Sequence, residues 1–464
     1  MSFTSPVVIG LEIHVQLNTR TKLFCGCRTS ADAPNSATCP ICLGHPGAKP
    51  VLNRIALEKA AVLALALGCT INATVQFSRK TYFYPDMSKN YQITQFELPL
   101  GADGALVLDS GKRVGIKRAH IEEDPAALVH QSEASYTLVD YNRSGVPLVE
   151  IVTEPAMDDP EEAREFIKKL MHVISYCKVF DENEGIIKAD ANVSIKETGY
   201  TRVEIKNITG AKEIERALEA EVARQHRCVK DGETVVQETR GWDAAAGITK
   251  AQRLKESEDD YGYIIDPDLP TIIMSDAMVA TLRQLVPELG ADKAKRFVDQ
   301  YGIDDVDAQV MAKEIELGQL FERVAQRVEP VLAARWMRRE LRRALAAANV
   351  SAADVDDANL VELLLLLQHK TITDRIGQRL TDRLVVEGIS PAAVVKSEGL
   401  GAVSDEGAIK AVVVAVIKDN GAVVEDFKKG SDKAFNFLVG QCMKQLKGKG
   451  SPQVITKILK EALA

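Results

Sequence analysis

The chain has 464 residues, of which 46% are hydrophobic and 27% charged, and its net charge is −8. This length suits two or three domains, and the acidic balance excludes a nucleic-acid coat while leaving room for a local basic patch. The longest apolar stretches, Ala60–Leu67 and Leu363–Leu367, are too short to span a membrane, and no signal-peptide pattern is visible. We therefore expect a cytoplasmic protein, whose cysteines are reduced or metal-bound.

The first strand is expected at residues 7–17, where Val, Ile and Leu predominate but Glu12 and His14 interrupt the pattern. Residues two apart on a strand share a face, so a carboxylate and an imidazole project side by side from an apolar strand. A desolvated carboxylate needs a partner. Two interpretations follow: a Glu–His pair inside the core, or a divalent-metal or proton-transfer site.

Two close cysteine pairs come next, Cys25 with Cys27 and Cys39 with Cys42. The polar loop between them contains Pro34–Ser36, which suits a turn that brings the pairs together. Half of the eight cysteines lie within these 18 residues, which disfavours four unrelated buried thiols. The spacing predicts a structural zinc site of four thiolates without an open coordination position.

After a helix expected at 53–67, the stretch 77–91 holds five aromatic residues together with Arg79, Lys80 and Lys89. Aromatic rings interleaved with cations can hold bases and phosphates. An aromatic edge of the core is an equally good interpretation of this stretch.

Acidic residues recur at the ends of, or inside, later strands. Two strands expected over 106–121 run into three consecutive acids at 122–124, which are typical of a solvated turn but could also complete a cation site. A further β-branched strand carries Glu150 in its interior, the same anomaly as Glu12. Two such carboxylates favour a functional site more strongly than one does.

The next elements alternate between helices and half-buried strands. We expect a helix that begins at 158–160, strands at 187–195 and 202–206, and a helix at 211–229. The polar residues of the two strands, which include Asp190 and Lys206, either meet solvent or line a polar cleft. Residues 256–270 carry turn chemistry and too many acids to belong to the core.

Helical patterns replace β-branched alternation after about residue 290, with runs expected at 305–327, 331–347 and 357–368. The sequence thus predicts domains at 1–290, 291–405 and 406–464. From Lys428 to Ala464 eight lysines stand against two acids. This local excess of positive charge on an acidic chain indicates a partner with a phosphate backbone, that is, a nucleic acid. A solvated lysine-rich helix face is the alternative.

No P-loop, dinucleotide-binding fingerprint or nucleophile elbow occurs in the sequence. A nucleotide, if one is used, would be held by carboxylates and a metal ion.

Several motifs together resemble one known family over essentially the whole chain. They are residues 7–14, the two cysteine pairs, and residues 80–86, 120–124, 142–151, 190–194, 204–207 and 434–441. The chain resembles GatB, the B-type subunit of the aspartyl/glutamyl-tRNA amidotransferases.

The resemblance implies an α+β fold: an antiparallel-sheet cradle similar to glutamine synthetase and the guanidino kinases, followed by an all-α domain and a small all-α tail that engage tRNA. It implies ATP-dependent amidation of misacylated Glu-tRNA(Gln), Asp-tRNA(Asn) or both, in a heterotrimer. The A-type partner, an amidase, supplies ammonia from glutamine, and a small C-type partner joins the two larger chains. The cofactors implied are ATP, Mg²⁺ and Zn²⁺.

The resemblance also assigns roles to single residues. They are Mg²⁺ ligands or water-positioning residues (Glu12, His14, Glu123, Glu150), contacts to phosphate or to the ammonia path (Lys80, Lys89), a catalytic residue (Asp190), cofactor-binding residues (Arg79, Lys206) and zinc ligands (Cys25, Cys27, Cys39, Cys42). These metal and phosphate roles agree with the needs of phosphoryl transfer, in which charge on the γ-phosphoryl oxygens must be neutralised.

One departure from the family pattern lies at Gly262 and Ile265, where many bacterial members have Arg and Phe, and it raises the archaeal branch as an alternative. The archaeal E-type relative does not fit, because the chain has no room for its inserted domain. A zinc-stapled tRNA-binding protein without chemistry is the main rival. It would explain the cysteines and the basic tail but not the carboxylates on apolar strands.

Overall fold

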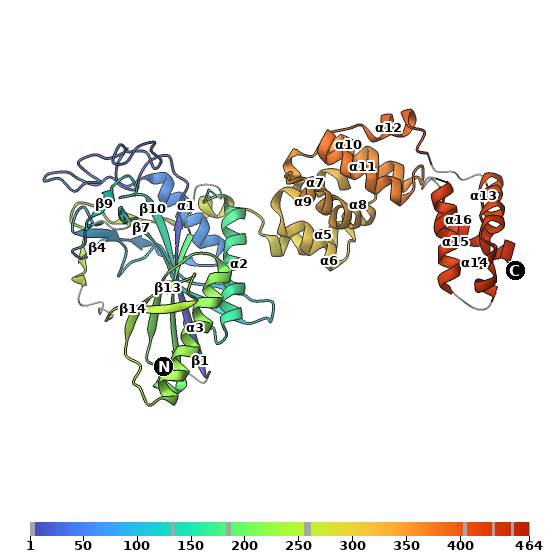
Figure 1. Ribbon diagram of the computed structural model, residues 1–464. Coiled ribbons are helices and arrows are strands. Elements are labelled where there is room, and N and C mark those ends of the chain that lie inside the picture. Colours follow the sequence, from blue (N-terminus) through green and yellow to red (C-terminus); the bar gives the residue numbers. More distant parts are fainter. Residues whose placement is uncertain are drawn as a thin grey trace. The chain divides into compact units, whose positions relative to one another are not determined.

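A computed structural model (Figure 1) describes residues 5–130, 135–181, 187–254, 261–401, 406–428, 432–446 and 450–463. The chain divides into two compact units, residues 1–289 and 290–464, and each is described by itself. Among the described residues, no helix has the length and apolar character needed to cross a membrane.

The first unit is built on a nine-stranded sheet with the order β14-β13-β12-β11-β1-β10-β7-β6-β2 (Figure 1). Its strands are β1 (Val7–Gln16), β2 (Thr70–Ile71), β6 (Gly101–Val107), β7 (Arg113–Glu123), β10 (Pro147–Thr153), β11 (Ile187–Ile195), β12 (Val203–Ile208), β13 (Glu238–Asp243) and β14 (Ile248–Leu254). Neighbours run antiparallel, apart from the parallel pair β12–β13. The predicted α+β class with a mainly antiparallel sheet is confirmed, and the likeness to glutamine synthetase stays a proposal.

Three small sheets complete the β structure of this unit. They are β15 (Ile264–Ile265) with β4 (Ser78–Thr81) and β5 (Tyr91–Thr94), β16 (Ile272–Ile273) with β3 (Thr74–Val75), and β8 (Ala127–His130) with β9 (Thr137–Asp140). The predicted polar stretch 256–270 includes residues 256–260, which lie outside the described part. In its described remainder the prediction that the acids avoid the core is wrong for Asp266, which is buried against Arg79.

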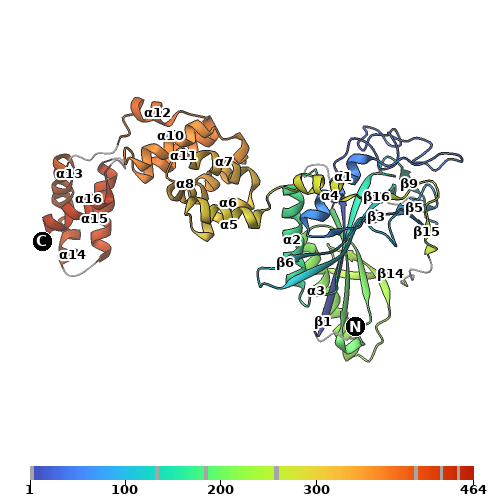
Figure 2. The same cartoon turned by 180° about the vertical axis from the view of Figure 1, so that it is seen from behind.

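Helices cover one face of the large sheet. These helices are α1 (Arg54–Ala66), α2 (Pro160–Cys177), α3 (Ala211–Lys230) and α4 (Asp276–Gln284), and Figure 2 shows α4 beside α1. The predicted caps are confirmed: the Asn53 side chain accepts hydrogen bonds from the first turn of α1, and Asp159 does the same for α2, which has Pro160 at its start. The apolar side chains of the sheet face these helices in one continuous core.

The second unit is helical. Its elements are α5 (Gly290–Tyr301), α6 (Asp305–Lys313), α7 (Ile315–Ala325), α8 (Pro330–Trp336), a π-helical turn (Met337–Leu341), α9 (Arg342–Ala348), α10 (Asp357–Gln368), α11 (Asp374–Glu387), α12 (Pro391–Ser397), α13 (Glu406–Asp419), α14 (Gly421–Lys428), α15 (Asp432–Gln445) and α16 (Pro452–Leu463). Two separate apolar clusters hold them, one spanning residues 294–400 and one spanning 409–459. We retain the predicted division near residue 405 as a proposal.

The predicted helix at 305–327 is two helices. Glu314 adopts an extended conformation between α6 and α7, and its carboxylate accepts hydrogen bonds from Arg342. The break was invisible in the sequence because no Gly or Pro marks it and a distant arginine provides its partner. The predicted helix at 357–368 is confirmed as α10.

Candidate active site

The alternation along β1 separates its side chains between two faces. Leu11, Ile13 and Val15 are buried in the core, so Glu12 and His14 project from the opposite face. Both line a cleft on that face, as the strand period predicts. The polar face of the sheet is therefore the place to look for chemistry.

Strand register brings three more side chains to His14. It lies opposite Glu150 of β10, and Glu150 lies opposite His120 of β7, which shares a face with Glu122. His14 Nε2 is 3.4 Å from Glu122 Oε1 and 3.5 Å from Glu150 Oε2. His120 Nε2 is 3.4 Å from Glu150 Oε2, so two imidazoles and two carboxylates form one cluster.

Part of this cluster has the chemistry of a metal site. His14, Glu122 and Glu150 each offer one ligand atom, and these atoms lie within 4.8 Å of one another. Two carboxylates with one imidazole suit a hard divalent cation such as Mg²⁺. His120 lies beside these three residues without belonging to the group, and its buried Nδ1 has no hydrogen-bond partner among the described residues. The group could hold a divalent metal ion.

The two carboxyl groups of the cluster differ in their pKa values. Burial and the charge of Glu150 raise the pKa of Glu122. Burial also acts to raise the pKa of Glu150, but His120 and His14 outweigh it and hold that pKa well below its ordinary value. Burial lowers the pKa of His14, yet the hydrogen bond with Glu150 and the nearby acidic charges bring it to about 10. Glu150 is thus firmly ionised, and the neighbouring Glu122 has a higher affinity for a proton.

The cluster lies in a cleft of about 690 Å³ that also takes in residues of β11 and β12. Lys206 Nζ donates to Asp190 Oδ2 at 2.9 Å and lies 3.4 Å from Glu204 Oε1. Glu12 accepts a hydrogen bond from Asn192 Nδ2 at 3.0 Å. The structure therefore brings the predicted residues Glu12, Asp190 and Lys206 into the same cleft as the group of His14, Glu122 and Glu150.

Lys80 enters the same cleft from β4. Its Nζ lies 4.6 Å from the centroid of the Tyr261 ring, and the adjacent Tyr263 stacks on Phe96 with ring centroids 4.1 Å apart. The ring that Lys80 contacts thus comes from outside the predicted aromatic stretch 77–91. Within that stretch one ring packs in the core while another lines the cleft, and the expected contact with bases or phosphates stays a prediction.

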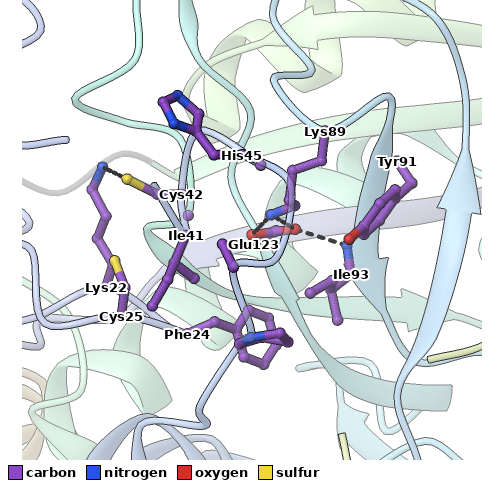
Figure 3. Close-up of a pocket in the computed structure, with 14 residues that line it drawn as sticks. Lys22, Phe24, Cys25, Ile41, Cys42, His45, Lys89, Tyr91, Ile93 and Glu123 are labelled. Atoms are coloured by element: carbon purple, nitrogen blue, oxygen red, sulfur yellow. Dashed lines mark hydrogen bonds and ion pairs between the residues drawn. The ribbon is translucent and has the colours of Figure 1, made fainter. Parts of the chain in front are cut away.

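Glu123 does not join the cluster. Neighbouring residues of a strand point to opposite faces, and Glu123 accepts a hydrogen bond from Ile93 N at 2.8 Å while Lys89 Nζ lies 2.6 Å from its carboxylate (Figure 3). The predicted placement of Glu123 in the metal group is therefore wrong, and Glu122 takes that position. Lys89 and Glu123 instead line a separate cavity of about 50 Å³ next to Cys25 and the other residues labelled in Figure 3.

Arg79 is placed as a structural cation outside the lining of the large cleft. Its Nε donates to Asp266 Oδ2 at 2.8 Å, its Nη2 donates to Asp268 Oδ2 at 3.0 Å, and its Cζ lies 4.3 Å from the centroid of the Tyr91 ring. The placement of Arg79 thus differs from that of Lys80, and its expected cofactor-binding role stays a prediction. Strand alternation explains the difference, because Lys80 and Arg79 are neighbours and face opposite ways.

The four predicted zinc ligands gather in one place. The Sγ atoms of Cys25, Cys27, Cys39 and Cys42 lie within 4.8 Å of one another. The fully buried Lys22 points its Nζ at Cys42 Sγ, 3.6 Å away (Figure 3). The hydrogen bond from Cys25 and the charge of Lys22 lower the pKa of the Cys42 thiol to about 4, although burial opposes this. A thiolate is the form that binds a metal, so this group could hold one.

Sequence reasoning missed several residues of the cleft. They are Arg118, His120, Arg143, Tyr261 and Tyr263, while Glu122 and Asp124 were expected only as members of the acidic run 122–124. The strand period would have singled out Glu122, because it lies two residues after His120 and therefore on the same face of the strand. No comparable signal existed for the tyrosines, because they reach the cleft through the pairing of β15 with the distant β4.

Comparisons with known proteins identify relatives that cover nearly the whole chain. Residues 7–280 match a family model described as the GatB/GatE catalytic domain, and residues 319–463 match one described as the GatB domain. The chain is 41% identical over 473 residues to the aspartyl/glutamyl-tRNA(Asn/Gln) amidotransferase B subunit of Caldanaerobacter subterraneus subsp. tengcongensis, with 98% of this chain and 99% of that relative covered. It is 43% identical over 469 residues to the protein of the same name from Brevibacillus brevis, with 98% of each covered.

The ion pair of Arg79 generates a stability prediction. Arg79→Met should lower the free energy of unfolding by about 3 kcal/mol, because the fully buried Asp266 carboxylate loses its cation. Urea unfolding measures the change, with Arg54→Met, at an exposed ion pair, as the control that should cost less than about 1 kcal/mol. An Arg79 variant of normal stability with weakened ATP binding would instead support the cofactor-binding role.

Proposed function

The chain belongs to the GatB family, the B-type subunits of the aspartyl/glutamyl-tRNA(Asn/Gln) amidotransferases, and from this premise we propose that its first unit carries the kinase and amidation site of such an enzyme. The substrate is tRNA(Gln) misacylated with Glu, tRNA(Asn) misacylated with Asp, or both. The observation that supports this proposal most strongly is the cluster of His14, Glu122 and Glu150 on the floor of the large cleft.

The chemistry overcomes the poor reactivity of a carboxylate as an acyl donor. An oxygen of the substrate's side-chain carboxylate attacks the γ-phosphorus of ATP, the bond to the β,γ-bridging oxygen breaks, and ADP leaves. Ammonia then attacks the acyl carbon of the acyl phosphate. The carbon–oxygen bond to the phosphate breaks, and hydrogen phosphate leaves with the proton that nitrogen loses. Mg²⁺, when bound, would neutralise charge on the phosphoryl oxygens.

The protein residues hold and orient the reactants in this scheme. His14, Glu122 and Glu150 would bind the metal ion, and the donor set fits it because two hard carboxylate oxygens converge there. Glu12 and Asp190 extend the acidic floor and suit the positioning of water ligands or of the acceptor. Lys80, which reaches the same cleft, suits a phosphate contact.

Lys89 and Glu123 suit a different role, because they lie away from the cluster. We assign them to the path by which ammonia reaches the cleft, in keeping with the small cavity that they line. The ammonia would come from glutamine hydrolysed by the A-type amidase partner, with the small C-type partner completing a heterotrimer. The word "subunit" in the relatives' names agrees with a multi-subunit complex.

The zinc proposal rests on the four gathered thiols. Four sulfur ligands fill the tetrahedral shell that Zn²⁺ prefers and leave no position for a substrate, so the role is structural. The α-helical second unit, and above all residues 406–464, would engage tRNA.

The central test uses two adjacent glutamates on opposite faces of β7. Glu122→Gln should reduce tRNA-dependent ATP hydrolysis by the assembled complex by about 10²-fold or more, since charge stabilisation by a metal contributes several kcal/mol. Glu123→Gln should leave the phosphoryl step largely intact, because its carboxylate faces Lys89 and not the cluster. Ammonium as nitrogen source keeps the assay independent of the amidase.

Thermal unfolding of both variants separates chemistry from stability. A Glu122→Gln protein that unfolds at lower temperature but hydrolyses ATP normally per folded molecule would identify a structural Glu–His cluster. Such a result would place the phosphoryl-transfer chemistry away from this cluster, whereas a wild-type complex without tRNA-dependent ATP hydrolysis would favour the rival tRNA-binding protein without chemistry.

Metal analysis tests the zinc proposal. The purified protein should contain about one zinc per chain, as expected for a four-thiolate site, and Cys42→Ser should lose it. Cys177→Ser is the control, since this partly buried cysteine lies outside the cluster and should leave the zinc content unchanged. Absence of zinc with four freely titratable thiols would contradict the proposal.

Truncation tests the role of the tail. Removal of residues 406–464 should weaken tRNA-dependent amidation and spare glutamine hydrolysis by the amidase partner. Exposed lysines of the tail, such as Lys433, Lys444 and Lys457, would release counterions from phosphates, so the loss should shrink as salt rises. Equal tRNA affinity with and without the tail at low salt would refute this role.

A further inference from the structure

Lys22 is a lysine whose exposed fraction is 0%. Its Nζ donates to the carbonyl oxygen of Tyr141 at 3.2 Å and points at Cys42 Sγ, 3.6 Å away (Figure 3). Among the described residues, no acidic side chain forms an ion pair with Lys22. Lys89, another largely buried lysine of this region, does have such a partner, because its Nζ lies 2.6 Å from the carboxylate of Glu123.

A fully buried ammonium group needs a negative charge nearby. Taking a charged group out of water costs free energy that a neutral carbonyl oxygen does not offset, so lysine is almost never fully buried unless it is paired. If all four thiols of the cysteine group were neutral, Lys22 would have no counter-charge. The burial of Lys22 therefore indicates that the cysteine group is negatively charged in the folded protein.

Lys22 contacts both halves of the cysteine group. Its backbone N donates to the carbonyl oxygen of Cys27 at 2.9 Å, in the first pair, while its side chain reaches Cys42 in the second pair. The backbone N of Cys39 donates to the same Sγ atom of Cys42 at 3.1 Å. Two N–H donors thus converge on Cys42 Sγ, and one of them carries a full positive charge.

A metal ion bound by four thiolates matches this environment. Four thiolates carry more negative charge than one divalent ion neutralises, so the metal-bound group stays anionic. Where water is excluded, an ammonium group in contact with one of the sulfur atoms stabilises this excess charge strongly. Groups that donate hydrogen bonds to metal ligands in this way adjust the affinity of a site for its metal.

We propose that Lys22 is the counter-cation of the four-cysteine metal group, and that its ammonium group stabilises the metal-bound form through Cys42 Sγ. The inference rests on the proposed zinc site and deepens it, since it names the residue that compensates the charge of the thiolates. Lys22 is a positioning residue in this role, because it acts on the metal through a ligand and is not itself a ligand.

The test compares zinc binding by the full-length chain with Lys22→Met, Lys22→Arg and Lys49→Met. Competition with a chromogenic chelator measures the affinity for zinc. Lys22→Met should weaken zinc binding about 10- to 100-fold, the range typical of losing a hydrogen-bond donor to a metal ligand. Lys22→Arg keeps the charge and should recover part of the loss. Lys49→Met is the matched control and should bind zinc normally, because Lys49 is exposed and pairs with Asp268.

A stability cycle separates charge compensation from a purely structural role. Cys42→Ser removes the thiolate that faces Lys22 and leaves the buried ammonium without its anion. Adding Lys22→Met to Cys42→Ser should therefore leave the unfolding temperature unchanged or raise it, whereas Lys22→Met alone should lower it. A structural role through packing and the Tyr141 carbonyl oxygen requires a similar fall in both backgrounds, and that result would overturn the proposal.

The remaining outcomes are also decisive. Normal zinc affinity in Lys22→Met would overturn the counter-cation role and leave the zinc site in place. A wild-type chain that binds no zinc would refute the zinc site itself. If Lys22→Met alone does not fold, the double variant with Cys42→Ser still decides the question: a folded double variant supports the proposal, and one that also fails to fold contradicts it.

Discussion

Pairing register between β1, β10 and β7 is the constraint on which the site depends. His14 meets Glu150 and Glu150 meets His120 because three separate stretches of chain align at one row of the sheet. A shift by one residue would turn each of these side chains toward the helices and expose apolar ones to the cleft. Ile13 and Ile151 alternate with the polar side chains and are buried against the helical layer. Their burial fixes the strand register, so the same contacts determine the hydrophobic core and the site.

The same alternation explains why adjacent residues serve different cavities. Glu122 enters the large cleft, while Glu123 turns to Lys89 and to the backbone of β5. Two carboxylates that follow one another in sequence are thus separated by the sheet itself. This separation allows one acid to remain in a cluster of metal-ligand character while the other forms a buried ion pair.

The cysteine loop is joined to this second cavity by packing. Ser88 and Ser144 both donate hydrogen bonds to the carbonyl oxygen of Cys42, and a side chain at Gly44 would collide with Lys89. Lys22 reaches the thiol of Cys42 from the other direction. One closely packed region therefore contains the four thiols, the Lys89–Glu123 pair and the turn before β10. The cysteine loop lines the small cavity in this region.

Local patterns in the sequence determined much of this protein: the caps at Asn53 and Asp159, the helix over 357–368, the shared face of Glu12 and His14, and the gathering of four cysteines. Each of these follows from residues close together in the chain, whose spacing alone decides which way they point. Tertiary structure decided the rest. Whether Glu122 or Glu123 meets His14, whether Arg79 finds Asp266, and how Tyr263 comes to stack on Phe96 depend on pairing between segments many residues apart. Strand period can divide residues between two faces, but only the packed core selects the register that brings distant faces together.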